Sequence, residues 1–94
     1  MLPSHRQPTH PGEILLEEFL QPLALTQAAL AAHLEIPTQR VNEIVRGKRG
    51  ITPETAWLLS QAFQTTPEFW MNLQAQYDLC LNRPQSVKSA LIPA

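Results

Sequence analysis

Apolar residues recur three and four positions apart along most of this chain, and that spacing predicts α-helices. The segment QAALAAHL shows the pattern, because Leu30, Ala31 and Leu34 fall on one side of a helix. The alternation of apolar and polar residues that is typical of β-strands is almost absent, and the chain has only 3 glycines. The sequence therefore predicts an all-α fold.

Prolines and hydroxyl residues predict where five helices begin and end. The first should open at Pro11 and stop before Pro22, because proline suits a first turn and interrupts a helix interior. The third should end at Gly47, since glycine readily adopts the left-handed conformation that closes a helix. The expected starts of the other four helices are Thr26, Pro37, Thr52-Pro53-Glu54 and Thr66-Pro67-Glu68.

A chain of 94 residues fits one domain with one modest core. We expect residues 10–82 to form this domain. Residues 1–9 and 83–94 contain prolines and serines and few large apolar groups, so we expect two flexible arms.

The single Cys80 cannot form an internal disulfide, and we expect its thiol to be buried among apolar neighbours. No apolar run approaches the roughly 20 residues of a membrane helix, and the N-terminus lacks the apolar core of a signal peptide. These features predict a cytoplasmic protein without a membrane partner.

Residues 37–50, PTQRVNEIVRGKRG, hold four of the 7 Lys and Arg residues in a chain of net charge −1. On a helix, Val41, Ile44 and Val45 share one side, which belongs to a core. The remaining surface carries polar groups: Thr38, Gln39, Arg40, Asn42, Glu43 and Arg46. Amides, hydroxyls and guanidinium groups read base edges in the major groove, so this helix is a candidate recognition helix for double-stranded DNA.

The segments on either side of this helix support the same hypothesis. Lys48 and Arg49 lie in a loop where a DNA backbone would pass, so we expect them to contact phosphates. The alanine-rich helix before it permits the close crossing of a helix-turn-helix. Gln27, in the first turn of that helix, is expected to contact phosphate or to brace the recognition helix.

Glu43 is the exception on this surface, because phosphates repel a carboxylate. We expect it to orient Arg46 or Arg40 and not to touch a base. The alternative for the cations is a solvated helix end, since the helix dipole favours positive charge there.

Catalysis and metal binding find no support in the sequence. The acidic residues of the first helix, Glu13, Glu17 and Glu18, have no nearby nucleophile or base, so they stabilise the helix dipole or meet a basic partner. The potential metal ligands lack ligand spacing: His5, His10, His33 and Cys80. We expect His10 to help the chain enter the first helix. The sequence predicts no enzyme, no cofactor and no small-molecule substrate.

The fifth helix carries more apolar surface than one small core can use. Two neighbouring stripes suggest that a second copy covers one of them, although an extended monomer core is the alternative. The candidate dimer residues are Phe69, Trp70, Leu73, Tyr77 and Leu81. Such a dimer would set two recognition helices about 34 Å apart and predict a palindromic operator.

Three motifs carry a family resemblance, namely HPGEIL, NEIVRGKRGIT and EFWMNLQ, which occur in this order between residues 10 and 80 or so. Together they resemble the HigA (VapI-type) antitoxins, which are Cro/C1-type (XRE) helix-turn-helix proteins. The turn departs from the family pattern, because Glu35 stands where glycine is usual. A left-handed Glu costs on the order of 1 kcal/mol relative to Gly, so we expect a slightly strained turn.

This resemblance implies a five-helix, lambda-repressor-like domain in a homodimeric antitoxin. Such a protein binds a HigB-like ribonuclease toxin and represses its own operon through operator DNA. It also implies that the nine polar residues singled out above, from Gln27 to Arg49, face the DNA. Two alternatives stay open: a stand-alone or phage-type transcription regulator without a toxin, and an interaction domain whose DNA surface has decayed.

Overall fold

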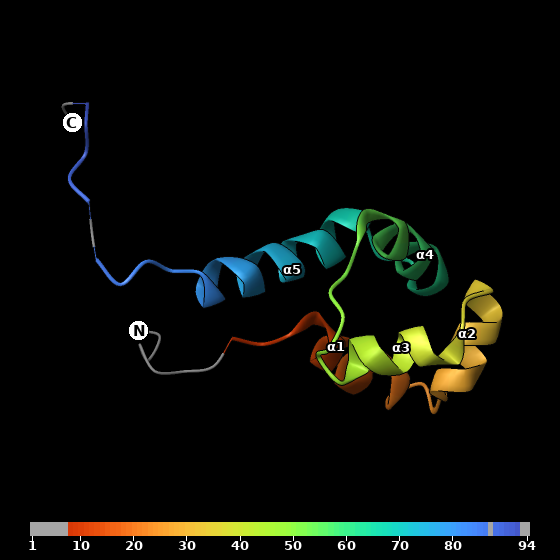
Figure 1. The fold of residues 1–94 in the computed structure, drawn as a ribbon. Helices are drawn as coiled ribbons and strands as arrows, with labels where there is room; N and C mark the ends of the chain where they lie inside the picture. The colour runs from red at the N-terminus through yellow and green to blue at the C-terminus, as the bar shows by residue number, and fades with distance from the viewer. Residues whose placement is uncertain (1–7, 87, 93–94) are drawn as a thin grey trace.

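The computed structural model describes residues 8–86 and 88–92, and the regular elements in these ranges are all helical (Figure 1). The expected all-α, helix-turn-helix architecture of five helices is confirmed, with the first helix built from two directly joined pieces. The elements are α1 (Pro11–Ile14), η1 (Leu15–Leu20), α2 (Gln27–Leu34), α3 (Thr38–Val45), α4 (Pro53–Phe63) and α5 (Pro67–Leu81).

Three of the helices begin at the threonines predicted to cap them. The Thr26 hydroxyl accepts from the backbone N–H of Ala29 at 3.0 Å, and the hydroxyls of the two Thr-Pro-Glu motifs do the same three residues ahead. Each threonine thereby satisfies one backbone donor that a first turn leaves unpaired. Pro53 and Pro67 follow at the first helical position, where their missing N–H costs nothing.

The first helix keeps its predicted limits but has an unexpected interior. Residues Leu15–Leu20 form a π-helix, in which the hydrogen bonds reach five residues back instead of four. The Gln21 N–H, for example, donates to the Leu16 carbonyl at 2.9 Å. Leu15 and Leu20, five positions apart, are both buried in the core.

The core lies where α2, α3, α4 and α5 meet the first helix, and its largest fully buried side chain is Trp70. The indole N–H of Trp70 donates to the Thr65 hydroxyl at 2.8 Å, so the polar end of this ring is satisfied inside the protomer. The other buried apolar residues are Leu15, Leu20, Leu30, Ala31, Leu34, Val41, Ile44, Ile51, Ala56 and Leu59.

Gly12 allows the first helix to cross α3 at backbone distance. A Cβ atom at this position would overlap the carbonyl oxygen of Ile44 and press on the Cα of Val45. Only glycine permits this approach, and the contact fixes α3 from the side opposite its exposed face.

The two arms differ in how far the structure describes them. The predicted N-terminal arm falls almost entirely outside the described residues. In the C-terminal arm, residues 83–86 and 88–92 form no helix or strand and run away from the helices (Figure 1). Cys80 is exposed near the end of α5, so the expectation that it is buried was wrong. Within the described ranges, no helix is long and apolar enough to cross a membrane.

His10 begins the first helix, as predicted, and it does so through its ring. Its Nδ1 atom accepts from the Gly12 N–H at 2.9 Å, and its ring meets Tyr77 of α5 edge-on at a centroid distance of 4.7 Å. Burial lowers the pKa of His10 from its usual value, while the carboxylates of Glu13 and Asp78 act in the opposite direction. The folded chain therefore favours the neutral ring, whose unprotonated Nδ1 can accept.

We expect the free energy of unfolding to decrease as the pH falls below about 6.5. The pKa of His10 is lower in the folded chain than in the unfolded one, so its contribution is complete above the unfolded value. As the pH is lowered further, that contribution declines, and the decline ends once the pH is below the pKa of His10 in the folded chain. Urea titrations between pH 7.5 and about 4.5 measure this slope. His10→Asn keeps a capping acceptor but cannot titrate, so it should flatten the slope, whereas His33→Gln on the exposed side of α2 should not.

Candidate nucleic-acid interface

Helices α2 and α3 form the predicted helix-turn-helix through a short apolar contact. Leu30 and Leu34 of α2 join Val41 and Ile44 of α3 in the core. Glu35 makes the turn between them in the left-handed conformation, with φ 58°. The strained turn expected at this non-glycine residue is therefore present, without a change of fold.

The buried and exposed sides of α3 are the ones that the helical projection predicted. Val41 and Ile44 are each 1% exposed, and Val45 packs partly against the core. The polar residues lie on the remaining surface. Thr38, Gln39 and Arg46 are exposed, and Arg40, Asn42 and Glu43 are partly exposed.

Gly47 closes α3 and turns the chain into the basic loop. Its φ of 75° lies in the left-handed region, as predicted for a helix-ending glycine. The Lys48 N–H then returns to the Glu43 carbonyl at 2.8 Å, which holds the loop against the end of α3. The side chains of Lys48 and Arg49 are exposed beside the polar face of α3.

Gln27 braces α3 from the neighbouring helix, which is one of the two roles expected for it. Its Oε1 atom accepts from the side-chain amide of Asn42 at 3.1 Å. This contact joins the first turn of α2 to the middle of α3. Because the Asn42 amide is held by a partly buried hydrogen bond, its orientation is fixed before any ligand arrives.

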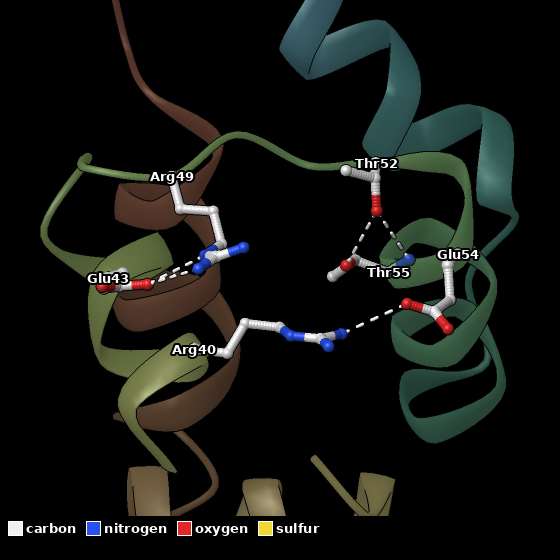
Figure 2. A network of polar contacts seen from close by, with 6 residues as sticks. All are labelled: Arg40, Glu43, Arg49, Thr52, Glu54 and Thr55. Atoms are coloured by element: carbon white, nitrogen blue, oxygen red, sulfur yellow. Dashed lines mark hydrogen bonds and ion pairs between the residues drawn. The ribbon is translucent and has the colours of Figure 1, made fainter. Parts of the chain in front are cut away.

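Two ion pairs cross the basic surface (Figure 2). Glu43 binds Arg49, whose Nη2 and Nε atoms lie 2.8 and 2.9 Å from the same carboxylate oxygen. Arg40 reaches in the other direction, to Glu54 at the start of α4, at 3.2 Å. The expectation that Glu43 orients Arg46 or Arg40 was wrong, because the turn at Gly47 brings Arg49 back over the Glu43 carboxylate.

The carboxylate of Glu43 accepts hydrogen bonds from two side chains. Its second oxygen accepts from the side-chain amide of Gln39, at 3.4 Å. The hydrogen bond from Arg49 is the main reason why the pKa of Glu43 lies below its usual value. Glu43 therefore carries its negative charge at neutral pH on the same face as the arginines.

Sequence reasoning missed two residues that connect this surface to the second half of the chain. Glu54 was noted only as a first-turn acid, and nothing in its motif distinguishes it from Glu68. Gln74 of α5 accepts from the Ile51 N–H at 2.7 Å and donates to Asp78 at 3.0 Å, which fastens the end of the basic loop to α5. Contacts that span 14 and 23 residues leave no signal in a helical pattern.

The candidate dimer residues of α5 are placed unevenly. Trp70 has no exposed surface and belongs to the protomer core, so its assignment to a dimer surface was wrong. Leu73 packs partly against the core, and Tyr77 is half-buried against His10. Phe69 is 37% exposed and Leu81 is 54% exposed.

Comparison with known proteins agrees with this geometry. A family model described as helix-turn-helix matches residues 16–70, which extend from the first helix into α5. Virulence-associated protein I of Dichelobacter nodosus is 50% identical over 70 residues, which cover 74% of this chain and 65% of that protein. The chain thus spans slightly less than two thirds of that relative.

Several similar structures contain DNA. A Pseudomonas aeruginosa protein solved in complex with its operator DNA is 46% identical, with a TM-score of 0.80 over 81% of this chain and 82% of that one. The antitoxin HigA of Pseudomonas aeruginosa, solved with the higBA promoter, is 47% identical, with a TM-score of 0.77 over 79% and 80% of the two chains.

These proteins belong to a class of DNA-binding regulators and antitoxins, which is not an enzyme class. The family model covers more than half of the chain, and the two solved structures cover 81% and 79% of it. The chain therefore belongs to the helix-turn-helix family of the Cro/C1 (XRE) type, in which it resembles the HigA antitoxins and virulence-associated protein I.

Proposed function

We propose that this chain is a cytoplasmic antitoxin that represses its own operon by binding operator DNA and that neutralises a HigB-like ribonuclease toxin by direct contact. The observation that carries the proposal is the polar outer face of α3, which presents amides and guanidinium groups while its inner face is locked into the core. Relatives solved with operator and promoter DNA support a DNA-binding role for the chain.

The polar groups of this face divide into two roles. The base-reading edge consists of Thr38, Gln39, Arg40, Asn42 and Arg46, because their hydroxyl, amide and guanidinium groups match the donors and acceptors of the major groove. Lys48 and Arg49 lie just beyond α3 and contact the phosphate backbone, which positions the protein without reading sequence. Gln27 holds Asn42 in place from the preceding helix. Glu43 belongs to the same surface through its pair with Arg49.

A homodimer is the second part of the proposal. We assign its interface to the apolar edge of α5 that includes Phe69, Leu73, Tyr77 and Leu81, of which Leu81 offers the most exposed surface. A two-fold axis at α5 places one α3 in each of two successive major grooves, about 34 Å apart, and calls for a palindromic operator.

The toxin is proposed to meet the acidic first helix. Glu13, Glu17 and Glu18 are all exposed there. Three like charges on one short helix suit a partner with a basic surface, because complementary potentials accelerate association.

Removing single DNA contacts should separate base reading from backbone contact. Arg40→Ala should cost about 1 to 3 kcal/mol of operator affinity and relax sequence preference, because a base-reading guanidinium is lost. Lys48→Ala should weaken operator and unrelated DNA alike and reduce the slope of log K against log salt by about 1. Mobility shifts with the protein's own upstream DNA and a scrambled duplex measure both effects.

Lys88→Ala is the matched control for these two variants, because it removes one positive charge outside the helical domain. The DNA affinity of this variant in the mobility-shift measurement should equal that of the unaltered protein. The proposed placement of α3 in the major groove is wrong if the unaltered protein binds its operator and neither Arg40→Ala nor Lys48→Ala changes that affinity.

A charge on the exposed edge of α5 should separate the dimer. Leu81→Glu should raise the dimer dissociation constant by about tenfold or more, because a carboxylate would be buried without a partner. Sedimentation equilibrium measures the constant. Leu23→Glu is the control, since Leu23 is 60% exposed, close to the 54% of Leu81, but lies in the turn after η1. A chain that is monomeric before any substitution contradicts the assignment.

The toxin half of the proposal predicts a small, basic reading frame beside this gene. Its product should arrest growth when expressed alone, and co-expression of this chain should restore growth and give a complex that co-purifies. Arg40→Ala should still restore growth, since neutralisation needs no DNA contact. A gene with no toxic neighbour supports the stand-alone transcription regulator instead.

A further inference from the structure

Two of the four cations on the DNA-facing surface are already held by carboxylates of the same chain (Figure 2). Arg49 is paired with Glu43, and Arg40 is paired with Glu54. Arg46 and Lys48, by contrast, form no ion pair with any residue in the described part of the chain. The net positive charge of this surface is therefore smaller than its four cationic side chains alone would give.

The two pairs leave part of each guanidinium free. Arg49 places Nε and Nη2 on one oxygen of Glu43, so its Nη1 atom remains available to another acceptor. Arg40 uses only Nη1 toward Glu54, which leaves Nη2 and Nε. A single acceptor can therefore bind either arginine while its carboxylate stays in place. For Arg40 this acceptor is a base edge, and for Arg49 it is the one phosphate that docking on the operator brings to Nη1.

Phosphate binding is affected differently by the same carboxylates. Non-specific affinity for DNA comes from cations that neutralise phosphates and release counterions. A carboxylate within 3.2 Å of each guanidinium already neutralises that cation. It also lies well within the screening length of about 8 Å at physiological salt, so it repels an approaching phosphate. These pairs therefore weaken indiscriminate phosphate contact more than they weaken the oriented contacts of the operator complex, which use the free nitrogen atoms of the two guanidinium groups.

We propose that Glu43 and Glu54 are specificity-determining positioning residues, which orient Arg49 and Arg40 for the operator and suppress binding to unrelated DNA. This inference rests on the proposed DNA-binding function of α3 and goes beyond it. The carboxylates act only through their arginines. Their contribution is seen in the ratio between operator and non-operator affinity, not in the stability of the fold, because exposed ion pairs stabilise little.

The test replaces each carboxylate by the amide of the same shape. Glu43→Gln and Glu54→Gln should each raise affinity for a scrambled duplex about three- to tenfold at 0.1 M salt. The slope of log K against log salt should steepen by about 0.9 for each guanidinium that is freed. Operator affinity should change much less, so the ratio of operator to scrambled affinity should fall.

Glu68→Gln is a closely matched control. Glu68 stands in the first turn of α5 after Thr66 and Pro67, as Glu54 stands in the first turn of α4 after Thr52 and Pro53. Both substitutions remove one negative charge and one favourable interaction with a helix dipole. Among the described residues, however, Glu68 pairs with no arginine. Equal effects of all three substitutions mean a simple change of net charge and overturn the proposal.

A double-mutant cycle tests whether Glu43 acts through Arg49. The gain in scrambled-DNA affinity from Glu43→Gln should largely disappear when Arg49 is already Gln. A persistent gain contradicts the pairing. A loss of operator affinity in Glu43→Gln without any gain on scrambled DNA means that Glu43 reads a base directly, and this also overturns the proposal. Circular dichroism melts establish that each variant is folded.

The unaltered protein separates this inference from the proposed function. If it binds its own upstream DNA no better than the scrambled duplex, the proposed operator function fails. If it prefers its own DNA and the two glutamine variants keep that preference unchanged, the carboxylate inference fails alone.

Discussion

The position of α3, the proposed recognition helix, depends on one backbone contact, made where Gly12 meets the carbonyl of Ile44. Helix α3 has only eight residues, and such a short helix is held mainly by what packs against it. Leu30 and Leu34 hold it from one side, and the first helix holds it from behind. The outer residues of α3 are consequently presented as a rigid edge, which reduces the ordering cost of binding.

The helix limits could be predicted because they depend on local chemistry. A capping hydroxyl followed by proline identifies the starts of α4 and α5, and Gly47 identifies the end of α3. The π-helical part of the first helix could not be predicted, since its residues are ordinary helix formers. Periodicity also placed Trp70 on an apolar stripe without telling whether the protomer or a second copy covers it. That distinction depends on tertiary packing, in which Phe19 of the first helix lies against the indole.

The candidate site shows the same division between local and tertiary information. The polar face of α3 follows from helical spacing alone, and so does the exposure of Lys48 and Arg49 in the loop. The choice of ion-pair partners does not, because Glu43 stands within one helical turn of Arg40 while Glu54, its actual partner, lies 14 residues away. Only the tertiary packing of α4 on α2 and α5 brings Glu54 within 3.2 Å of it.

Gln74 gives the protein a thermodynamic connection between its two proposed binding surfaces. The amide of this α5 residue holds the Ile51 N–H at the end of the loop that carries Lys48 and Arg49. Any ligand that changes this hydrogen bond when it binds α5 also changes the free energy of placing the loop on DNA. Linkage is reciprocal, so DNA then alters the affinity of that ligand by the same factor. In that case DNA binding at the proposed α3 surface and partner binding at the proposed α5 surface are one coupled equilibrium, so the concentration of either ligand sets the occupancy of the other.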